Sequence, residues 1–220
     1  MAFRDRKDAG IQLAARLAKL GVSKDAVVLG IPRGGVSVAY EIAKAIGAPL
    51  DIFLSKKLGV PGQEELAFGA IAANGYRFLD ERLIQSEGIT TEQVDRLSQE
   101  ALRLLEDRSK LYRSGWPETR LSRRTAILVD DGIATGASIY AAILALREYQ
   151  PSKLIVAVPV APDSVCRWLA QFTDQLICLC EPKNFYAVGQ FYYNFEQVPD
   201  EVVRNCLRQA KEFAVPPDAS

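Results

Sequence analysis

One segment, residues 126–138, constrains the fold of this chain more than any other. It has the sequence Ala-Ile-Leu-Val-Asp-Asp-Gly-Ile-Ala-Thr-Gly-Ala-Ser. The four apolar residues predict a buried strand, and the two acidic residues lie at its carboxyl end, where open α/β sheets bind ligands. The loop that follows leads into a helical pattern, so its backbone N–H groups can bind a phosphate at the start of that helix.

The two acidic residues, Asp130 and Asp131, indicate what else such a site binds. Adjacent carboxylates repel a bare phosphate, but they accept hydrogen bonds from the vicinal hydroxyls of a sugar. The Walker A and Rossmann phosphate motifs fit less well, because the lysine of the first and the G-x-G-x-x-G of the second are missing. The segment therefore predicts a sugar phosphate site; the structural alternative is a capped turn without a ligand.

Short apolar runs alternate with helical patterns along the chain, which is typical of a parallel sheet with helices on its faces. We expect strands over 26–31, 50–54, 125–129, 154–160 and 175–180, a short strand over 76–79, and helices over 8–20, 36–46, 136–149 and 162–172. The first helix is expected to bury Ile11, Ala14, Ala15 and Leu17. A long helix over 91–112 has an apolar stripe that fits either core packing or a partner; its members are Val94, Leu97, Ala101, Leu104, Leu105 and Leu111.

Three other segments have no such alternation. Residues 55–69 contain three glycines and a proline without a clear period, so we expect a long flexible loop, a kind of segment that is usually functional. Residues 113–124 form a polar linker whose basic residues (Arg120, Arg123 and Arg124) suggest either a solvated surface or a basic face. A terminal helix is expected from Pro199, and residues 214–220 are expected to fray.

The composition excludes several classes of protein. The chain has 220 residues and no histidine, which rules out Ser-His-Asp and Cys-His hydrolases and zinc sites that need imidazole. Lys+Arg and Asp+Glu both number 27, so the chain lacks the basic excess on which non-specific nucleic-acid binding relies. No apolar run reaches the length of a membrane span and the first residues are charged, so we expect a cytoplasmic protein. The four cysteines include no C-x2-C pair and are expected to be reduced, structural thiols.

With its preceding strand, the sequence VDDGIATGAS (residues 129–138) resembles the binding signature for 5-phosphoribosyl-1-pyrophosphate (PRPP) of the type I phosphoribosyltransferases. More loosely, the resemblance covers residues 8–195. It implies an α/β fold: a parallel-sheet core with helices on both faces and a small C-terminal hood. The implied organisation is a core over 1–180 that includes the flexible loop, a hood over 181–198, and a C-terminal helix and tail over 199–220.

The resemblance also implies roles for the residues of the signature. Asp130 and Asp131 would hold the ribose hydroxyls and act in catalysis. The following loop would bind the substrate, with the 5-phosphate at its second half; its residues are Gly132, Ile133, Ala134, Thr135, Gly136, Ala137 and Ser138. Some purine-salvage members have an Asp where this chain has Ala134, whereas the adenine branch has Ala.

Two further segments resemble parts of the same family. Residues 29–35 (LGIPRGG) are similar to its pyrophosphate loop, which implies Arg33 as a catalytic cation, Gly34 and Gly35 as substrate-binding residues, and a strained peptide bond near Arg33–Gly34. Taken alone, a glycine-rich turn would explain that stretch equally well. Lys56 and Lys57 match the catalytic cations of the flexible loop that closes over PRPP.

Residues 182–189 resemble the hood of purine-salvage enzymes, although the spacing to Gly189 is one residue longer than in the hypoxanthine-guanine branch. Phe185 or Tyr186 would stack on the acceptor base, and Lys183 or Asn184 would contact its polar edges. Simple aromatic packing is the alternative explanation.

The function implied is the transfer of phosphoribosyl between PRPP and a purine-like or related nitrogenous base, as in purine salvage. Mg²⁺ would be the cofactor, bound through the substrate or through Asp130 and Asp131. The family also implies a cytoplasmic homodimer that acts on small molecules, away from membranes and nucleic acid. The alternative is a non-catalytic regulator of the same fold that senses PRPP or a nucleotide.

Overall fold

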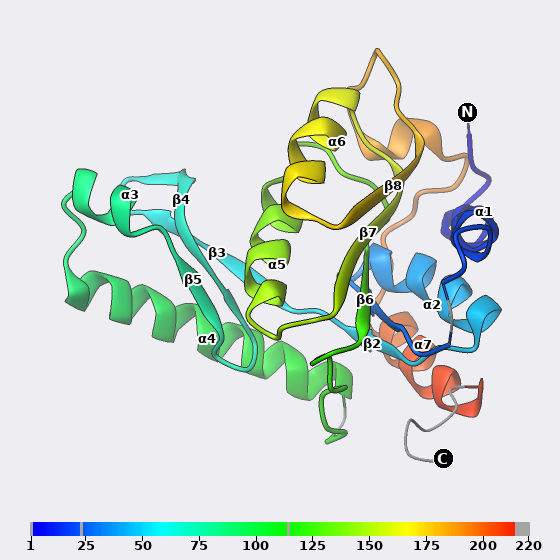
Figure 1. Cartoon of the computed structure of the whole chain (residues 1–220), viewed down its shortest axis with the longest axis horizontal. Helices are drawn as coiled ribbons and strands as arrows, with labels where there is room; N and C mark the ends of the chain where they lie inside the picture. Colours follow the sequence, from blue (N-terminus) through cyan, green and yellow to red (C-terminus); the bar gives the residue numbers. More distant parts are fainter. Residues whose placement is uncertain (1, 23, 114, 214–220) are drawn as a thin grey trace.

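The computed structural model describes residues 2–22, 24–113 and 115–213, and its centre is a five-stranded parallel sheet (Figure 1). The order is β2-β1-β6-β7-β8, so β1 and β6 are neighbours at the point where the strand order reverses. The strands are β1 (Val27–Gly30), β2 (Leu50–Ile52), β6 (Thr125–Val129), β7 (Lys153–Val160) and β8 (Gln175–Cys180). The predicted parallel α/β fold is confirmed.

Alternate residues of these strands face two separate hydrophobic layers, as the two-residue period of a strand requires. On β6, Ile127 and Val129 pack toward one face, and Ala126 and Leu128 pack toward the other. The first face is covered by α1 (Arg6–Ala18), α2 (Gly34–Ile46) and α7 (Asp200–Phe213), and the second by α5 (Ala137–Arg147) and α6 (Asp163–Leu169) (Figure 1). A short 3-10 helix, η1 (Ala170–Phe172), follows α6. A second one, η2 (Val188–Phe191), lies within the expected hood.

Local signals explain where the helices begin and end. The side chain of Asp5 accepts a hydrogen bond from the N–H of Asp8 and caps α1. Gly47 ends α2 in the left-handed conformation, with φ +67°. The apolar faces of two helices differ from the prediction. In α1, Ile11 (48% exposed) and Ala15 face solvent, because the helix turns Leu13 inward. In α4 (Thr91–Arg113), Leu104 (54%) and Leu111 (42%) face solvent, because the helix turns Ser98 inward.

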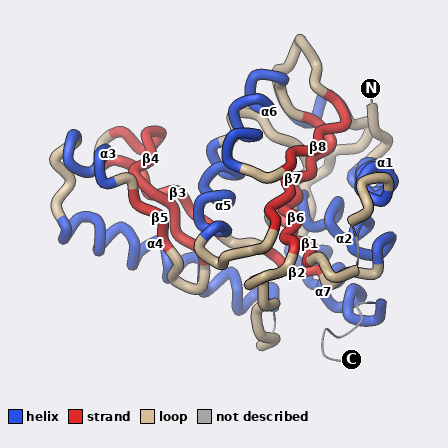
Figure 2. The backbone as a smooth tube through the Cα atoms, in the orientation of Figure 1, coloured by secondary structure: helices blue, strands red, loops and turns tan. Residues whose placement is uncertain are grey.

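Residues 55–113 form a second unit beyond α5, which we call the arm (Figure 2). It contains an antiparallel sheet of order β3-β4-β5, a short helix and the long α4. Its other elements are β3 (Ser55–Val60), β4 (Gln63–Ala72), β5 (Arg77–Leu79) and α3 (Glu81–Ser86). The prediction of an irregular loop over 55–69 is wrong in secondary structure, because Pro61 and Gly62 (φ +81°) make a tight turn that joins two paired strands.

A buried ion pair joins the arm to the central sheet. The Nε of Arg113, at the end of α4, lies 3.0 Å from Oδ1 of Asp51 in β2. Another nitrogen of the same guanidinium donates to the carbonyl of Ile52 at 3.0 Å, and the N–H of Thr119 donates to Asp51 Oδ2 at 2.8 Å. Both members of the pair are less than a tenth exposed, so each charge depends on the other.

The C-terminal part of the chain packs against the same core. Val203, Leu207 and Ala210 of α7 belong to the hydrophobic layer that contains α1 and α2. The predicted fraying of residues 214–220 falls outside the described residues. None of the described helices combines the length and apolar character needed to cross a membrane.

Candidate functional site

Two loops meet at the carboxyl edge of the central sheet, between β1 and β6. Residues 32–35, which we call the PRGG loop, follow β1, and residues 130–136, the acidic loop, follow β6. The peptide bond between Pro32 and Arg33 is cis, one residue before the bond expected to be unusual. This edge is the place where open sheets of this kind bind ligands.

The glycines of the PRGG loop allow it to lie directly on the acidic residues. A Cβ on Gly34 would overlap the carboxylate of Asp131 and lie 2.8 Å from Nε of Arg6. A Cβ on Gly35 would lie 2.8 Å from Cα of Asp130 and 2.7 Å from the carbonyl oxygen of Val129. The structure therefore brings together two segments that are far apart in the sequence.

The two carboxylates have different environments. Asp131 Oδ2 accepts a hydrogen bond of 2.7 Å from Nε of Arg6, and that ion pair is largely buried. Asp130 Oδ1 accepts the N–H of Asp131 at 2.8 Å. Burial raises the pKa of Asp130 well above its usual range, and the negative charge of Asp131 adds to that rise. A cation or a hydroxyl donor at this edge would relieve that penalty.

Arg6, at the start of α1, and Tyr192, in the hood, hold Asp131 in place, and the sequence did not indicate this. Arg6 also donates to the carbonyl of Glu196 at 2.8 Å, and its guanidinium lies 3.9 Å from the centroid of the Phe195 ring. The hydroxyl of Tyr192 donates to the backbone carbonyl of Asp131 at 2.6 Å. No local pattern marks Arg6 or Tyr192, because each acts through a contact with a distant part of the chain.

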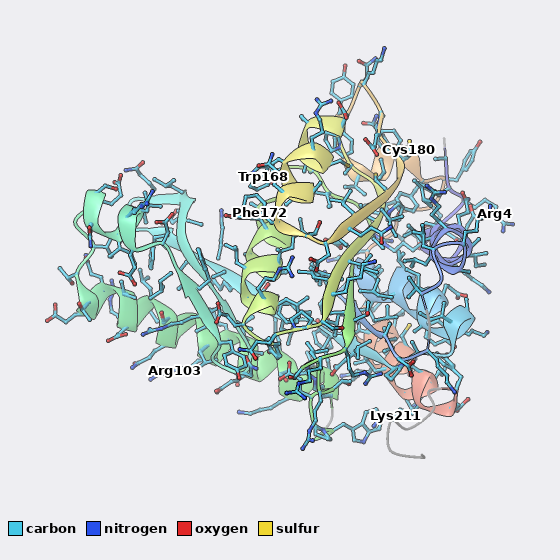
Figure 3. The ribbon with its side chains drawn as sticks, viewed as in Figure 1. Arg4, Arg103, Trp168, Phe172, Cys180 and Lys211 are labelled. Atoms are coloured by element: carbon cyan, nitrogen blue, oxygen red, sulfur yellow. The ribbon has the colours of Figure 1, made fainter. Side chains whose placement is uncertain are left out.

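The acidic loop has one buried and one exposed part. The N–H of Ile133 donates to the carbonyl of Val160 at 2.9 Å, and this buried contact ties the loop to β7. Ala134, Thr135 and Ser138 are exposed. Gly136 (φ +82°) precedes the first residue of α5, so the exposed part leads to the amino end of that helix. A Cβ on Gly136 would lie 2.8 Å from the ring of Trp168. Trp168, which is labelled in Figure 3, belongs to α6.

The three predicted cations do not share one cavity. Lys57 and Ala137 line one cavity of about 200 Å³ together with Tyr140 and Trp168. Lys56, which is exposed, lies with Glu64 in a cavity between β3 and α4 of about 250 Å³, which Lys57 also lines. Arg33 lines a third cavity of about 500 Å³ beside Arg108, Tyr112 and Asp200. Of the three, Lys57 is the one that shares a cavity with the start of α5, where the acidic loop ends.

The hood contacts the acidic loop through its apolar side chains. A Cβ on Gly132 would overlap Val188 of η2, so the hood rests on the start of the loop. The ring of Phe185 stacks on Phe191 with 5.5 Å between centroids, whereas Tyr186 is 90% exposed. Lys183 is also exposed. Of the two predicted stacking residues, Phe185 is therefore a packing residue in this structure, and Tyr186 is the one whose ring is open to a ligand.

A parallel sheet of this order, with an acidic pair and a glycine loop at its switch point, defines the fold of the type I phosphoribosyltransferases. The chain belongs to the family described as phosphoribosyl transferase domain, whose model matches residues 4–196. The family expected from residues 129–138 is thereby confirmed.

Individual relatives agree with this assignment. Two proteins from strains of Mycobacterium tuberculosis, named "Putative phosphoribosyl transferase MT0597" and "Putative phosphoribosyl transferase Rv0571c", are each 45% identical over 213 residues. These matches cover 96% of this chain and 48% of each relative, so the chain spans about half the length of these curated relatives. The crystal structure of TT1426 from Thermus thermophilus is 38% identical, covers 98% of this chain and 100% of that protein, and has a TM-score of 0.89.

Proposed function

We propose that this protein transfers a phosphoribosyl group between PRPP and a nitrogenous base, with pyrophosphate as the leaving group. One observation carries the proposal: Gly34 and Gly35 of the PRGG loop lie directly against the carboxylates of Asp130 and Asp131. A ligand at this edge would contact backbone groups of one loop and acidic groups of the other. PRPP offers a pyrophosphate to the first and ribose hydroxyls to the second.

The geometry supports a division of roles within the acidic loop. Arg6 holds Oδ2 of Asp131, and Asp130 lies beside it, so the two carboxylates would accept hydrogen bonds from the ribose hydroxyls. The exposed residues Ala134 and Thr135 precede α5, whose amino end favours the 5-phosphate. Arg6 is a positioning residue, because it acts on the ribose through Asp131.

The reaction breaks the bond between C1 of the ribose and the pyrophosphate oxygen, and the electron pair leaves with pyrophosphate. The lone pair of a base nitrogen forms the new bond to C1, and the proton that this nitrogen carried is released. Catalysis of this step needs positioning and stabilisation of charge more than a covalent nucleophile. Arg33 and Lys57 would balance the charge that develops on pyrophosphate, which agrees with a chain without histidine.

The acidic pair fits a magnesium ion. Mg²⁺ prefers oxygen ligands, and Asp130 and Asp131 present carboxylate oxygens at the edge where the two loops meet. The raised pKa of Asp130 indicates a place where negative charge is poorly solvated and a cation is favourable. Bound there with PRPP, Mg²⁺ would neutralise negative charge on the pyrophosphate.

The acceptor would be a purine-like or related heterocycle held under the hood. The ring of Tyr186 is exposed, and Lys183 lies just before it in the same segment and is also exposed. Ala134 offers no carboxylate to a base nitrogen, which favours an adenine-like acceptor over hypoxanthine or guanine.

Calorimetric titration with PRPP and Mg²⁺ tests the proposal. The wild type should bind PRPP in a Mg²⁺-dependent manner, and the double variant Asp130→Asn/Asp131→Asn should not bind. A screen of bases for pyrophosphate release then identifies the acceptor. PRPP binding without release for any base would favour the non-catalytic regulator, and absence of PRPP binding by the folded wild type would refute the proposed ligand.

A further inference from the structure

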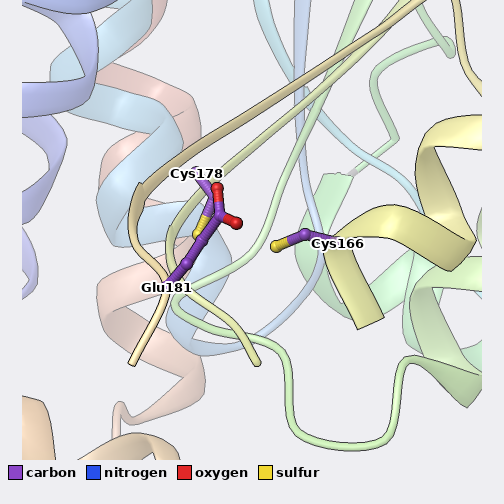
Figure 4. Close-up of side chains that lie close together, drawn as sticks. All are labelled: Cys166, Cys178 and Glu181. Carbon is purple, nitrogen blue, oxygen red and sulfur yellow. The ribbon is translucent and has the colours of Figure 1, made fainter. Parts of the chain in front are cut away.

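Three side chains with metal-binding groups converge where α6 meets the end of β8 (Figure 4). They are Cys166 of α6, Cys178 of β8, and Glu181 directly after β8. One ligand atom of each lies within 4.8 Å of the other two. Among the described residues, no other group of three or more cysteines and acidic side chains comes this close.

The donor set selects a particular class of cation. Two thiolates and one carboxylate suit a borderline-soft metal such as Zn²⁺ and do not suit Mg²⁺, which takes oxygen ligands. In a tetrahedral zinc site the ligand atoms are roughly 3.5–3.8 Å apart, given the usual Zn–S and Zn–O bond lengths. The observed separations therefore need only small changes in side-chain torsion to reach that geometry.

The surroundings already orient the three groups. In the absence of metal, the thiol of Cys178 donates to the carbonyl of Cys180 at 3.1 Å, and metal binding would release the protons of both thiols to solvent. In Figure 4 the sulfur of Cys166 points from α6 toward Cys178 and Glu181. Cys166 is buried, Cys178 is partly buried and Glu181 is exposed, so the cluster opens to solvent on the carboxylate side. A water molecule could complete the fourth position of a metal from that side.

Sequence spacing explains why a search for zinc motifs misses this cluster. Cys178 and Glu181 have the spacing of a C-x2-C pair, with a carboxylate in place of the second thiol. The third ligand comes from another element, so only the fold brings it into range.

We propose that Cys166, Cys178 and Glu181 bind a single Zn²⁺-like cation that joins α6 to the base of the hood. Val165 and Trp168, on either side of Cys166, contact Gly136 of the acidic loop, and Glu181 begins the hood. The cation would therefore stabilise the two elements that flank the acidic loop. This inference does not depend on PRPP or on the proposed reaction.

The test uses the full chain, stripped with chelator and kept reduced. ZnCl2 titration by calorimetry should show one site per chain, which excess Mg²⁺ does not displace. CoCl2 should produce a thiolate-to-cobalt charge-transfer band. At about 100-fold excess of Zn²⁺ over its dissociation constant, Tm should rise by roughly 5–10 °C.

Matched variants separate this site from adventitious binding. Cys166→Ser and Cys178→Ser should each lower the Zn²⁺ affinity roughly 100-fold, since the loss of a ligand matters at least as much as the loss of a group that only orients a ligand. Cys206→Ser, which changes a thiol on α7 outside the cluster, should leave the affinity unchanged. Glu181→Gln, at an exposed position where folding should not be affected, should weaken Zn²⁺ binding about tenfold and keep the cobalt band. Equal Zn²⁺ affinities of Glu181→Gln and the wild type, or absence of the cobalt band, would overturn the proposal.

Discussion

The loop edge of the central sheet and the arm use the same residue, glycine, for different physical reasons. At the edge, Gly34 and Gly35 have no room for a Cβ because backbone and carboxylates lie against them. In the arm, Gly62, Gly75 and Gly88 have open space around them and positive φ values of 65–88°. The comparison shows that glycine permits close contact between loops at the edge and permits turns in the arm.

The largest expected change in stability comes from the buried ion pair that joins the arm to the central sheet. Arg113→Met leaves the buried carboxylate of Asp51 without its cation and should lower the free energy of unfolding by about 3–5 kcal/mol. Thermal unfolding measures the change. Arg77→Met is the matched control, because the side chains of its ion pair with Asp95 within the arm are 41% and 52% exposed, and the pair should contribute at most about 1 kcal/mol. Equal losses in the two variants would contradict the role of Arg113 as the buried link.

The next effect concerns the glycines themselves. Gly34→Ala places a methyl group against Asp131 and Arg6, so it should weaken PRPP binding about 100-fold by displacing the two loops from each other. Gly62→Ala should cost about 1–2 kcal/mol of stability through its positive φ and leave PRPP binding unchanged. Calorimetry and thermal unfolding of both variants distinguish close contact from turn conformation. If Gly34→Ala binds PRPP normally, the two loops do not form one site.

The arm should contribute one cation to the edge. Lys57 shares a cavity with Ala137 at the start of α5, so Lys57→Met should lower turnover at saturating PRPP by roughly 10–100-fold. Lys56→Met removes the same charge from the adjacent position, which is exposed and lies beside α4, and should have a smaller effect. Steady-state assays of pyrophosphate release compare the two. A larger loss in Lys56→Met would reverse the assignment.

The smallest expected effect is a gain in stability at the edge. The folded state raises the pKa of Asp130, so it favours the protonated carboxyl, and the stability this provides is lost as pH rises above the ordinary pKa of 3.8. Asp130→Asn cannot ionise and should therefore have a higher Tm than the wild type at neutral pH, by about 2–4 °C. Tm measured from about pH 4 to pH 8 should show this difference growing with pH. A difference that is constant or shrinks over that range would exclude Asp130 as its source.

The sequence predicted the central sheet well because its strands are uninterrupted apolar runs between polar segments. β6 and β8 have the predicted ends. The hairpin of the arm was missed although Pro61-Gly62 is a turn signal, because glycines at 59 and 69 interrupt the two-residue period of its strands. The short α3, which has no buried residue, leaves no apolar pattern to detect.

The candidate site was predictable only where its residues are contiguous. Asp130 and Asp131 are visible because strand, acids, loop and helix follow one another within residues 126–138. Arg6 and Tyr192 could not be predicted from the sequence, because they contact Asp131 from positions 125 and 61 residues away in the chain. The Cys166 cluster likewise needs the fold to join α6 to β8.

The contacts that hold Asp131 join residues far apart in the chain, which affects the order in which this part of the molecule can form during translation. Arg6 and its carbonyl partner at Glu196 are 190 residues apart in the chain. At about 5–20 residues per second, that partner is synthesised roughly 10–40 s later. The support of Asp131 is therefore complete only after all five strands of the central sheet have been synthesised, and a nascent chain stalled before Tyr192 can build that sheet while Asp131 still lacks its contact with the Tyr192 hydroxyl.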